Sequence, residues 1–386
     1  MKKILILISY YFPGTRSGGP QQTIKNLVDM FSHVAEFYIY TQNHDLGIKE
    51  EYQGIEFNKW IKRGNSNVMY VSSDEYYKKL AELYREFKII YSCGLFERCS
   101  IMALYNHKKF YAHDLEKKLY IAPMGVFSKG AIRSKYLKKY FFLRVFSALG
   151  MFKHVIWSFS STAELNDALN YLNPHNLSNY IIAEDLPCKV DFQQQLQRLE
   201  NSNLSDGKRM KIIFLGRICH TKNLEYSIDI LKNIYKKDLI FDIYGPIEEQ
   251  TYWKKCKRKL ECLPPNIKYR YCGAVEPNNV ITIFSQYDIF LFPTKGENYG
   301  HVIYEAMSAG CIPIISDTTP WRDLEKENCG FICALDDIES FQRVLIQLIS
   351  IDMYRLTKLK KNAILYAEKK YTNSLTDSGY FTLINE

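Results

Sequence analysis

Long apolar runs, cysteine pairs and metal-binding acid motifs are all missing from this chain of 386 residues. No apolar run reaches the roughly 20 residues that cross a bilayer as a helix. The apolar start, MKKILILIS, is followed by YYFPG rather than by the small residues of a signal-peptide cleavage site, so we expect a buried strand there. The 10 cysteines are scattered without a C-x-x-C pair, which indicates reduced thiols in a cytosolic protein rather than a disulfide framework.

The composition is that of a folded protein with two domains. A length of 386 residues predicts two domains of ordinary size, and a hydrophobic content of 47% provides a core for each. With only 24% charged residues, the chain does not resemble a disordered protein. The net charge of +9 indicates an acidic partner, such as anionic lipid, a nucleotide or nucleic acid.

The most informative stretch, residues 288–323, has the pattern of a strand, a loop, a helix and a second strand. Residues 288–294 (DIFLFPT) form a short, bulky apolar run, which is typical of a buried parallel strand. Residues 295–300 contain two glycines and an asparagine, which predict a loop. The apolar spacing predicts a helix over 299–309 that stops at a glycine, followed by a strand over 311–316.

Two carboxylates flank the helix N-terminus in this stretch. Ligands of open α/β sheets bind where strands end and helices begin, and the free amides and the helix dipole there favour a phosphate. Glu297 and Glu305, with seven residues between them, would be repelled by a phosphate but suit the vicinal hydroxyls of a sugar nucleotide. The spacing alone also allows a plainer interpretation, in which one glutamate is a loop tip and the other a solvated helix residue.

The run ENYGHVIYEAMSAGCIPIIS resembles the E-x7-E signature of retaining GT-B glycosyltransferases of the glycosyltransferase family 4, or glycosyl transferases group 1, type. It is most similar to members that act in bacterial capsule, O-antigen and exopolysaccharide assembly. Both glutamates, the Gly300 turn, the EAMSAG helix and the apolar strand fit, and TTPWRDL over 318–324 looks like the family's continuation. The resemblance covers most of the chain and is stronger in the second half.

The resemblance implies an α/β chain with the GT-B fold, in which two Rossmann-like domains face each other across a cleft. We expect an acceptor-binding domain over 1–190, a linker over 191–208 and a nucleotide-sugar-binding domain over 209–370. The linker is predicted from its polar Gln, Asn and Ser content. A C-terminal helix over 371–386 that crosses back to the first domain is implied by the resemblance alone.

Four further loop residues gain a role from the resemblance. Arg217 and Lys222 in KIIFLGRICHTKN follow a predicted strand, where a guanidinium fork and an ammonium suit a diphosphate, although plain surface charges would have the same spacing. In similar glycosyltransferases this G-R…K-N pattern clamps the donor diphosphate. The corresponding Gly-Gly loop, here Gly18 and Gly19, faces the diphosphate and the reacting centre.

The predicted site comprises the catalytic residues Glu297, Arg217 and Lys222 and the donor-binding residues Gly18, Gly19, Gly216, Asn298, Tyr299, Gly300 and Glu305. We expect a retaining glycosyltransferase of the hexosyltransferase type that moves a sugar from a nucleotide-diphosphate sugar to a lipid-linked saccharide in bacterial capsule or lipopolysaccharide biosynthesis. Because no D-x-D motif stands at a strand end, we expect no metal and no cofactor besides the nucleotide sugar. The helix N-terminus with Arg217 and Lys222 would neutralise the leaving diphosphate instead.

A basic stretch suggests where this protein is located. Residues 131–157 mix bases with bulky apolar residues, and no acid lies between Arg133 and Lys153. Two interpretations are open: a buried helix whose bases snorkel to solvent, or a basic amphipathic helix on an anionic membrane. We predict a peripheral membrane contact through about Arg133 to Lys153, and hence a cytoplasmic protein on the inner face of the plasma membrane.

Three alternative functions are less well supported by the residues. A GT-B nucleotide-sugar epimerase would resemble a different signature, and a non-catalytic nucleotide-sugar-binding partner subunit would not need the glutamates and bases of the site intact. A nucleic-acid-binding protein is prompted by the charge and the many aromatic residues. No nucleic-acid recognition motif is present and the bases cluster near Arg133, so we expect no nucleic-acid partner.

Overall fold

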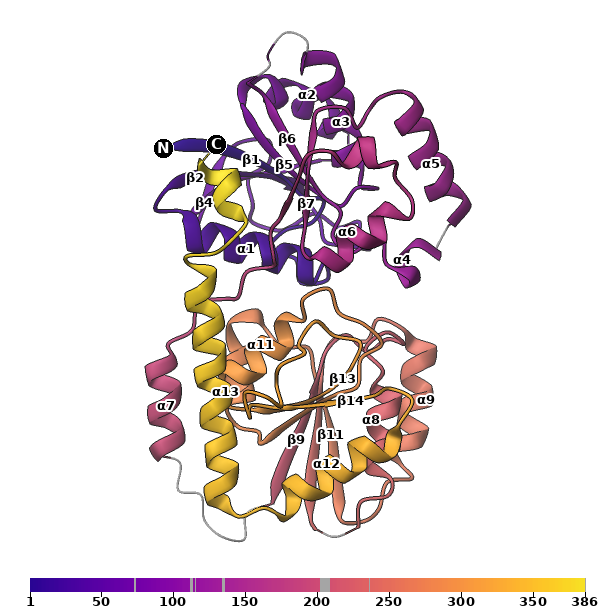
Figure 1. The fold of residues 1–386 in the computed structure, drawn as a ribbon, viewed down its shortest axis with the longest axis vertical. Coiled ribbons are helices and arrows are strands. Elements are labelled where there is room, and N and C mark those ends of the chain that lie inside the picture. Colours follow the sequence, from indigo (N-terminus) through magenta and orange to yellow (C-terminus); the bar gives the residue numbers. More distant parts are fainter. Residues whose placement is uncertain are drawn as a thin grey trace. The chain divides into compact units, whose positions relative to one another are not determined.

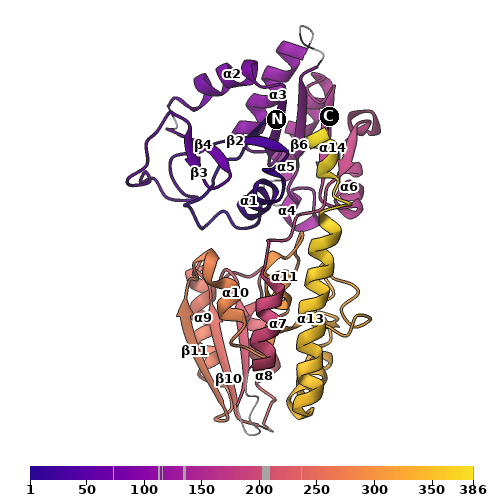
Figure 2. The same cartoon turned by 90° about the vertical axis from the view of Figure 1, so that its left-hand side faces the viewer.

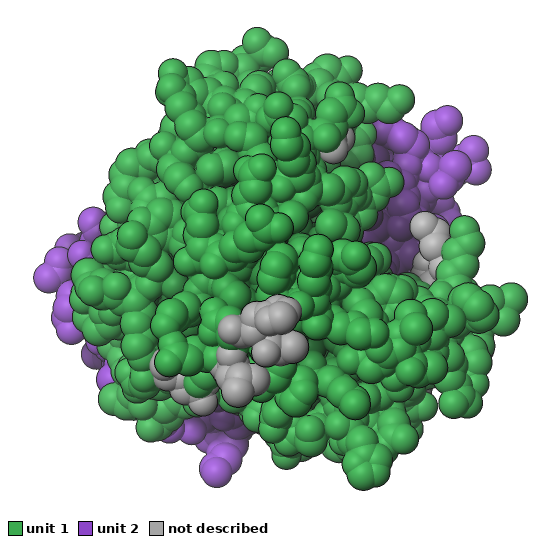
Figure 3. Space-filling view, turned by 90° about the horizontal axis from the view of Figure 1, so that it is seen from above, with its two compact units in different colours: residues 1–186, 374–386 green, residues 187–373 purple. Residues whose placement is uncertain are grey.

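The computed structural model describes residues 1–72, 74–111, 114, 116–133, 136–201, 209–235 and 237–385. The chain forms two compact units, coloured separately in Figure 3: unit 1 consists of residues 1–186 and 374–386, and unit 2 of residues 187–373. Each unit is built around a largely parallel sheet with helices on its faces (Figure 1). The expected α/β class with two Rossmann-like domains is confirmed.

Unit 1 contains an eight-stranded sheet with the order β3-β4-β2-β1-β5-β6-β7-β8, in which only β3 is antiparallel to its neighbour. Its strands are β1 (Lys2–Leu7), β2 (Ala35–Gln42), β3 (Ile61–Arg63), β4 (Ser66–Val71), β5 (Ile89–Cys93), β6 (Lys118–Ala122), β7 (Val155–Phe159) and β8 (Tyr180–Ile182). Its helices are α1 (Gly19–Phe31), α2 (Tyr76–Glu86), α3 (Arg98–Phe110), α4 (Lys129–Arg133), α5 (Tyr136–Ala148), α6 (Thr162–Leu169), the 3₁₀ helix η2 (Pro174–Leu177) and α14 (Tyr380–Asn385).

Unit 2 contains a six-stranded parallel sheet with the order β11-β10-β9-β12-β13-β14. Its strands are β9 (Met210–Leu215), β10 (Leu239–Tyr244), β11 (Ile267–Gly273), β12 (Ile289–Phe292), β13 (Ile312–Ser316) and β14 (Phe331–Cys333). Its helices are α7 (Phe192–Asn201), α8 (Leu224–Leu231), α9 (Gln250–Leu260), the 3₁₀ helix η3 (Pro277–Asn279), α10 (Val280–Phe284), α11 (His301–Ser308), α12 (Ile338–Ser350) and α13 (Met353–Ser374).

The central strands are apolar along their whole length because helices cover both faces of each sheet. Every residue of β12 is buried, and so are all five residues of β13. Burial of one Leu, Ile or Phe side chain contributes about 1.5–3 kcal/mol, so a four-residue strand of this kind is strongly favoured in the interior. This burial fixes β12 and therefore the positions at which the loops on either side of it begin.

The order of strands reverses once in each sheet, and this reversal defines where a ligand can bind. In unit 2 the chain goes from β9 to β10 on one side, and returns to place β12 on the other side of β9. Right-handed crossovers then place α8 and α11 on opposite faces, as Figure 1 shows. The loops after β9 and β12 diverge at this switch point, which is the usual ligand site of such sheets. In unit 1 the corresponding strands are β1 and β5.

The first half of the predicted linker over 191–208 is a helix in the structure. Residues Phe192–Asn201 form α7, whose Phe192 belongs to the core of unit 2, with Leu196 and Leu199 packed against that core. Residues 202–208 lie outside the described residues. The compact-unit boundary instead falls between Leu186 and Pro187.

The C-terminal residues return to unit 1. Helix α13 is 22 residues long and ends at Ser374, where the second segment of unit 1 begins (Figure 2). The α14 helix then packs within unit 1: the ring of Phe381 lies edge-on to Phe31 with centroids 5.2 Å apart, and the hydroxyls of Tyr380 and Tyr91 are 3.4 Å apart. Among the helices that the structure describes, none combines the length and the apolar character needed to cross a membrane.

A buried histidine in unit 1 is held in its neutral form. The Nδ1 atom of His107 lies 2.8 Å from the Tyr84 hydroxyl, and Nε2 lies 3.1 Å from the His154 carbonyl oxygen. Since a carbonyl only accepts, Nε2 carries the proton and Nδ1 accepts from Tyr84. Burial lowers the pKa of His107 to about 4.

This arrangement predicts a specific loss of stability in acid. The unfolded chain takes up a proton at about pH 6.5, whereas folded His107 does so only near pH 4, so each step down in pH across that window favours unfolding. The full difference is about 3 kcal/mol. His107→Gln removes this group. Between pH 7 and pH 4 the free energy of unfolding of the parent should therefore fall by about 3 kcal/mol more than that of His107→Gln. Urea denaturation at both pH values measures this, with the exposed His33→Gln as control; parallel losses in parent and His107→Gln would contradict it.

Candidate functional site

Two loops of unit 2 meet at the switch point of its sheet. The loop after β9 leads to α8, and the loop after β12 leads to α11. The backbone nitrogen of Lys295 donates to the Thr221 carbonyl oxygen at 2.9 Å, and the side-chain amide of Asn223 donates to the Pro293 carbonyl oxygen at 2.9 Å. These bonds tie the two loops together directly after their strands end.

The backbone conformation of Asn223 helps to place the neighbouring Lys222. It is the residue before α8 and adopts the left-handed conformation, with φ 62° and ψ 39°. Asparagine tolerates this region better than most residues. Because its buried side chain is bonded to the other loop, the backbone turn sets the position of Lys222 next to it.

Lys222 and Glu297 form the central contact of the site. The Lys222 Nζ lies 2.6 Å from Oε1 and 2.8 Å from Oε2 of Glu297, and the side chains are 16% and 9% exposed. The Thr294 hydroxyl donates to Glu297 Oε1 at 2.9 Å. An ammonium has three donors, so Lys222 can hold Glu297 and still contact an anion.

The glycine at the start of α11 shapes the loop around Glu297. Gly300 precedes the helix with φ 84°, and a Cβ there would lie 2.9 Å from the Ile303 side chain and 3.5 Å from the Cβ of Glu297. The indole Nε1 of Trp321 donates to the Tyr299 carbonyl oxygen at 2.7 Å. The loop is therefore fixed from the strand to the N-terminus of α11, where the helix dipole favours an anion.

Asn298 lies in the predicted loop and Glu305 in the predicted helix, whereas Tyr299 lies before α11 rather than at its start. Asn298 is exposed in the loop, and Tyr299 is half-buried with its ring 5.4 Å from that of Trp321. Glu305 is half-buried in the second turn of α11. Glu297 and Glu305 thus come from the loop and the helix of one βαβ unit.

Arg217 has a partner that the sequence did not suggest. Its Nη1 lies 2.7 Å from Glu248 Oε2 in the loop after β10, and both side chains are partly exposed. His220 pairs in the same way with the neighbouring Glu249. Of the predicted pair of bases, Lys222 is joined to Glu297 while Arg217 is joined to Glu248.

Close backbone packing at the ends of β9 and β10 explains why glycine occupies position 245. Gly245 has φ 137°, and a Cβ there would lie 1.8 Å from the carbonyl oxygen of Gly216. A Cβ on Gly216 itself would lie 3.3 Å from the ring of Phe292. The ends of β9 and β10 therefore approach each other closely.

The glycine pair of unit 1 lies in the loop after β1, at the switch point of that sheet. Gly18 has φ 68° and precedes α1, and a Cβ on Gly18 or Gly19 would meet no atom within 4 Å. The loop is anchored by Asp45, whose Oδ2 accepts from the Thr15 amide at 2.9 Å. The glycines are thus open to a ligand while the rest of the loop is held.

Sequence reasoning missed Thr294, Glu248 and Asp45. Thr294 ends the apolar run, where a hydroxyl after a strand was a usable signal. Glu248 lies 31 positions from Arg217 and Asp45 lies 30 positions from Thr15, so no local sequence pattern indicates these contacts.

Part of the chain is similar in sequence to known glycosyltransferases. Residues 196–370 match the family described as glycosyl transferases group 1. An uncharacterised 41.2 kDa protein in the cps region of Klebsiella pneumoniae is 25% identical over 130 residues, which cover 33% of this chain and 34% of that protein. The Escherichia coli UDP-Gal:alpha-D-GlcNAc-diphosphoundecaprenol alpha-1,3-galactosyltransferase is 26% identical over 171 residues, which cover 42% and 44%. The chain therefore spans less than half the length of these relatives.

Solved structures resemble the whole chain. WaaG, a glycosyltransferase involved in lipopolysaccharide biosynthesis, superimposes with a TM-score of 0.66 at 14% identity over 98% of both chains. Anabaena HepE in complex with UDP-glucose gives a TM-score of 0.69 at 15% identity over 100% of both chains. Residues 196–370 therefore match the glycosyl transferases group 1 family, in a chain whose fold is that of the GT-B glycosyltransferases.

Proposed function

We propose that this protein is a retaining glycosyltransferase that transfers a sugar from a nucleotide-diphosphate sugar. The observation that carries the proposal is the Lys222–Glu297 pair at the switch point of unit 2, directly before the N-terminus of α11. A cation and a helix N-terminus suit a diphosphate, and a carboxylate suits sugar hydroxyls. Such a site holds both halves of a nucleotide sugar.

Each residue then has a separate task. Lys222, Arg217 and the first amides of α11 hold the diphosphate and stabilise the charge that develops on it as it leaves. Glu297 holds a hydroxyl of the donor sugar, with Asn298, Tyr299 and Gly300 beside it, and Glu305 holds the ribose. Gly216 leaves room for Lys222, and Gly18 and Gly19 are the donor-binding residues proposed in unit 1. Three positive groups around the diphosphate provide the neutralisation that a divalent metal provides elsewhere, so we propose that no metal is required. We also propose that the donor is a hexose, in keeping with the hexosyltransferase type expected from the sequence.

We also propose that the acceptor is a lipid-linked saccharide of a bacterial surface polysaccharide. The name of the Escherichia coli relative describes an acceptor on diphosphoundecaprenol, and WaaG is described as acting in lipopolysaccharide biosynthesis. A lipid-linked acceptor cannot leave the bilayer, so the enzyme must work at the membrane surface. The proposed location is the inner face of the plasma membrane.

Helix α5 has the surface that such a location needs. Leu143 is the one fully buried residue of α5 among those described, while Leu137 is 79% and Phe141 is 70% exposed. Lys138 and Arg144 are also exposed. Of the predicted stretch Arg133 to Lys153, Ser134 and Lys135 lie outside the described residues. A helix with this many exposed residues is not a buried core helix, and its exposed bases would be attracted to an anionic membrane surface.

The first prediction concerns the two bases of the diphosphate site. Arg217→Gln and Lys222→Gln should each weaken binding of uridine diphosphate about tenfold or more, because each removes a charge-assisted hydrogen bond, and should slow transfer by roughly 10²–10³. Glu248→Gln should tighten binding a few-fold at most, because it releases Arg217 from an exposed ion pair worth about 0–1 kcal/mol. Titration calorimetry measures the affinity of the three variants for uridine diphosphate, and a transfer assay measures their rates. The exposed Lys257→Gln on α9 is the control. Parental affinity and rate in both base variants would place the diphosphate elsewhere.

The second prediction separates the two glutamates. Glu297→Gln keeps the shape and the bond from Thr294, so it should preserve binding of the free nucleotide but lower turnover by roughly 10² or more, because the lost charge acts on the sugar. Glu305→Gln should weaken the free nucleotide about tenfold, because the ribose hydroxyls lose an ionised acceptor. Nucleotide affinity and single-turnover transfer are measured for each variant. Equal effects of the two changes on nucleotide binding would show that their roles are not separate.

The third prediction tests α5 as the membrane contact. Lys138→Gln with Arg144→Gln should weaken sedimentation with phosphatidylglycerol vesicles by about 2 kcal/mol, or roughly thirtyfold in affinity, since each base near an anionic surface contributes about 1 kcal/mol. Phe141→Ser should remove the part of binding that survives high salt. The matched control is Lys254→Gln with Lys257→Gln on α9, which removes the same charge. A parent that stays in solution at low salt, or a control pair that loses as much binding, would rule α5 out.

A further inference from the structure

The switch point of unit 1 carries a carboxylate to which the transfer reaction assigns no task. Glu97 lies at the end of the loop after β5, directly before α3, and its Oε2 accepts from the Ser9 hydroxyl at 2.7 Å. Ser9 lies in the loop after β1, and its carbonyl oxygen accepts from the Gln42 amide at the end of β2 at 3.2 Å. The loops after β1 and β5 are therefore joined where open α/β sheets bind their ligands.

A glycine makes room for the Glu97 side chain. Gly94 has φ 83°, and a Cβ there would lie 2.7 Å from Cγ of Glu97. The Gly94 amide donates to the Ala122 carbonyl oxygen at 2.8 Å, and the Gly94 carbonyl oxygen accepts from the Glu97 amide at 3.0 Å. The backbone that carries the carboxylate is thus held in place. Glu97 is exposed, and among the described residues its Oε1 has no partner, so this oxygen can accept from a ligand.

A small pocket opens beside this carboxylate. It has a volume of about 20 Å³ and is lined by Ser9, Gln42, Tyr76, Tyr77, Arg98 and Cys99. A water molecule needs roughly 10–15 Å³ of such volume, so the pocket has room for one water or one hydroxyl group but not for a sugar ring. Because Arg98 is exposed and Gln42 and Tyr77 are half-buried, the pocket is open to solvent.

The pocket contains a buried hydroxyl that lacks a good partner. Tyr76 is 4% exposed, and among the described residues its hydroxyl makes no hydrogen bond of normal geometry. The Cys99 thiol lies beside it, but a thiol is a weak donor and a weak acceptor. Cys99 Sγ lies 3.9 Å from Ser9 Oγ, so the Tyr76 hydroxyl is on the side of the pocket next to the Ser9–Glu97 bond. Buried polar atoms without a partner are uncommon, and a polar group from outside the protein would satisfy this one.

The charges around the pocket favour a neutral ligand. Burial and the Glu97 carboxylate raise the pKa of the Tyr10 phenol while Arg98 lowers it, so an acid and a base lie near the same ring. Glu97 would repel an anion, and Arg98 would repel a cation. A hydroxyl suits both groups, because it donates one hydrogen bond and accepts two. A neutral compound with several hydroxyls, which is a saccharide, therefore matches this surface.

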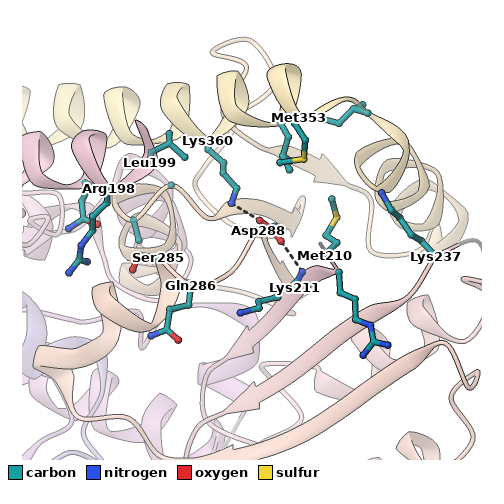
Figure 4. Close-up of a pocket in the computed structure, with 16 residues that line it drawn as sticks. Arg198, Leu199, Met210, Lys211, Lys237, Ser285, Gln286, Asp288, Met353 and Lys360 are labelled. Atoms are coloured by element: carbon teal, nitrogen blue, oxygen red, sulfur yellow. Dashed lines mark hydrogen bonds and ion pairs between the residues drawn. The ribbon is translucent and has the colours of Figure 1, made fainter. Parts of the chain in front are cut away.

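The larger cavity of unit 2, beside the first residues of β9, lacks this convergence. Both oxygens of its one acid are taken, because Asp288 Oδ1 lies 2.6 Å from Lys360 Nζ and Oδ2 accepts from the Lys211 amide at 2.8 Å (Figure 4). Its exposed bases Arg198 and Lys237 lie on different sides of the cavity (Figure 4). The pocket of unit 1 is smaller, but it brings a carboxylate and an unpartnered hydroxyl to one opening.

We propose that this pocket of unit 1 recognises a single hydroxyl group of a saccharide. That hydroxyl enters the pocket and bonds to the Tyr76 hydroxyl, a neighbouring hydroxyl of the same sugar donates to Oε1 of Glu97, and Arg98 donates to the remaining oxygens. The identification of this saccharide as the acceptor rests on the proposed function, because transfer requires a second sugar besides the donor. Tyr76 then determines acceptor specificity, since a sugar without the hydroxyl leaves a buried polar group unpaired.

Saturation-transfer NMR of the full chain tests the pocket, with the methyl glycosides of glucose, galactose, N-acetylglucosamine and rhamnose as probes. We expect at least one glycoside to bind, and removal of one particular hydroxyl from it to weaken binding about tenfold. Tyr76→Phe should weaken the intact glycoside about tenfold and abolish its advantage over that deoxy derivative, because the group that contacts the hydroxyl is gone. Glu97→Gln should also weaken the glycoside about tenfold, because an ionised acceptor is lost.

Tyr84→Phe on the same helix is the matched control, because the Tyr84 hydroxyl is already bonded to His107. Tyr84→Phe should lower the midpoint of urea denaturation and leave glycoside binding unchanged. Tyr76→Phe should show the opposite pattern, with the midpoint of the parent or a higher one and weakened binding. Glu86→Gln, at the exposed end of α2, controls for the loss of a negative charge.

Uridine diphosphate, titrated into the parent and each variant, separates this proposal from the proposed function. A parent that binds uridine diphosphate but none of the glycosides overturns the pocket and leaves the proposed function intact. Glycoside binding that is unchanged in both Tyr76→Phe and Glu97→Gln likewise overturns the pocket. A parent that binds a glycoside but not uridine diphosphate contradicts the proposed function and the acceptor role, while loss of binding in Tyr76→Phe still supports the saccharide site.

Discussion

The ion pair between Lys222 and Glu297 is the contact on which the functional part of unit 2 depends. Neither side chain is well exposed, so each charge needs the other, and removal of one partner would leave a charge with little solvation. The two residues belong to different loops, and they can pair only when β9 and β12 are neighbours in the sheet. The Asn223 side chain and the Lys295 amide fasten the same loops by neutral hydrogen bonds. The sheet order, and therefore the hydrophobic core, holds the two charges at the switch point before any ligand arrives.

Local patterns predicted much of this arrangement, and long-range contacts account for what they missed. The apolar run of β12 and the glycine that ends α11 are properties of short windows, and both were predicted within two residues. The polar composition of residues 192–201 indicates a linker, although the spacing of Phe192, Leu196 and Leu199 is that of the helix α7. The partner of Arg217 could not be predicted, because Glu248 approaches it only through the pairing of β9 with β10.

The surplus of bases in the chain is not spread evenly over its surface. One group is contiguous in the sequence on α5, where Lys138 and Arg144 stand among exposed apolar side chains. Other bases, among them Arg198, Lys211 and Lys237, border a cavity beside the first residues of β9 and come from separate segments of the chain. A sequence window can reveal the first group but not the second, because these bases are far apart in the chain. Net charge alone therefore says little about which surface an acidic partner would choose.

The return of the chain to unit 1 affects how this protein folds during synthesis. Residues 187–373 are an insertion between the two segments of unit 1, and α14 supplies Tyr380, Leu383 and Ile384 to its interior. A ribosome makes β1 to β8 first, so the site that α14 covers beside Phe31 and Tyr91 stays open to water until α14 emerges. Unit 2 is continuous and can fold as soon as its own residues have emerged, whereas unit 1 is completed after unit 2 although its synthesis starts first.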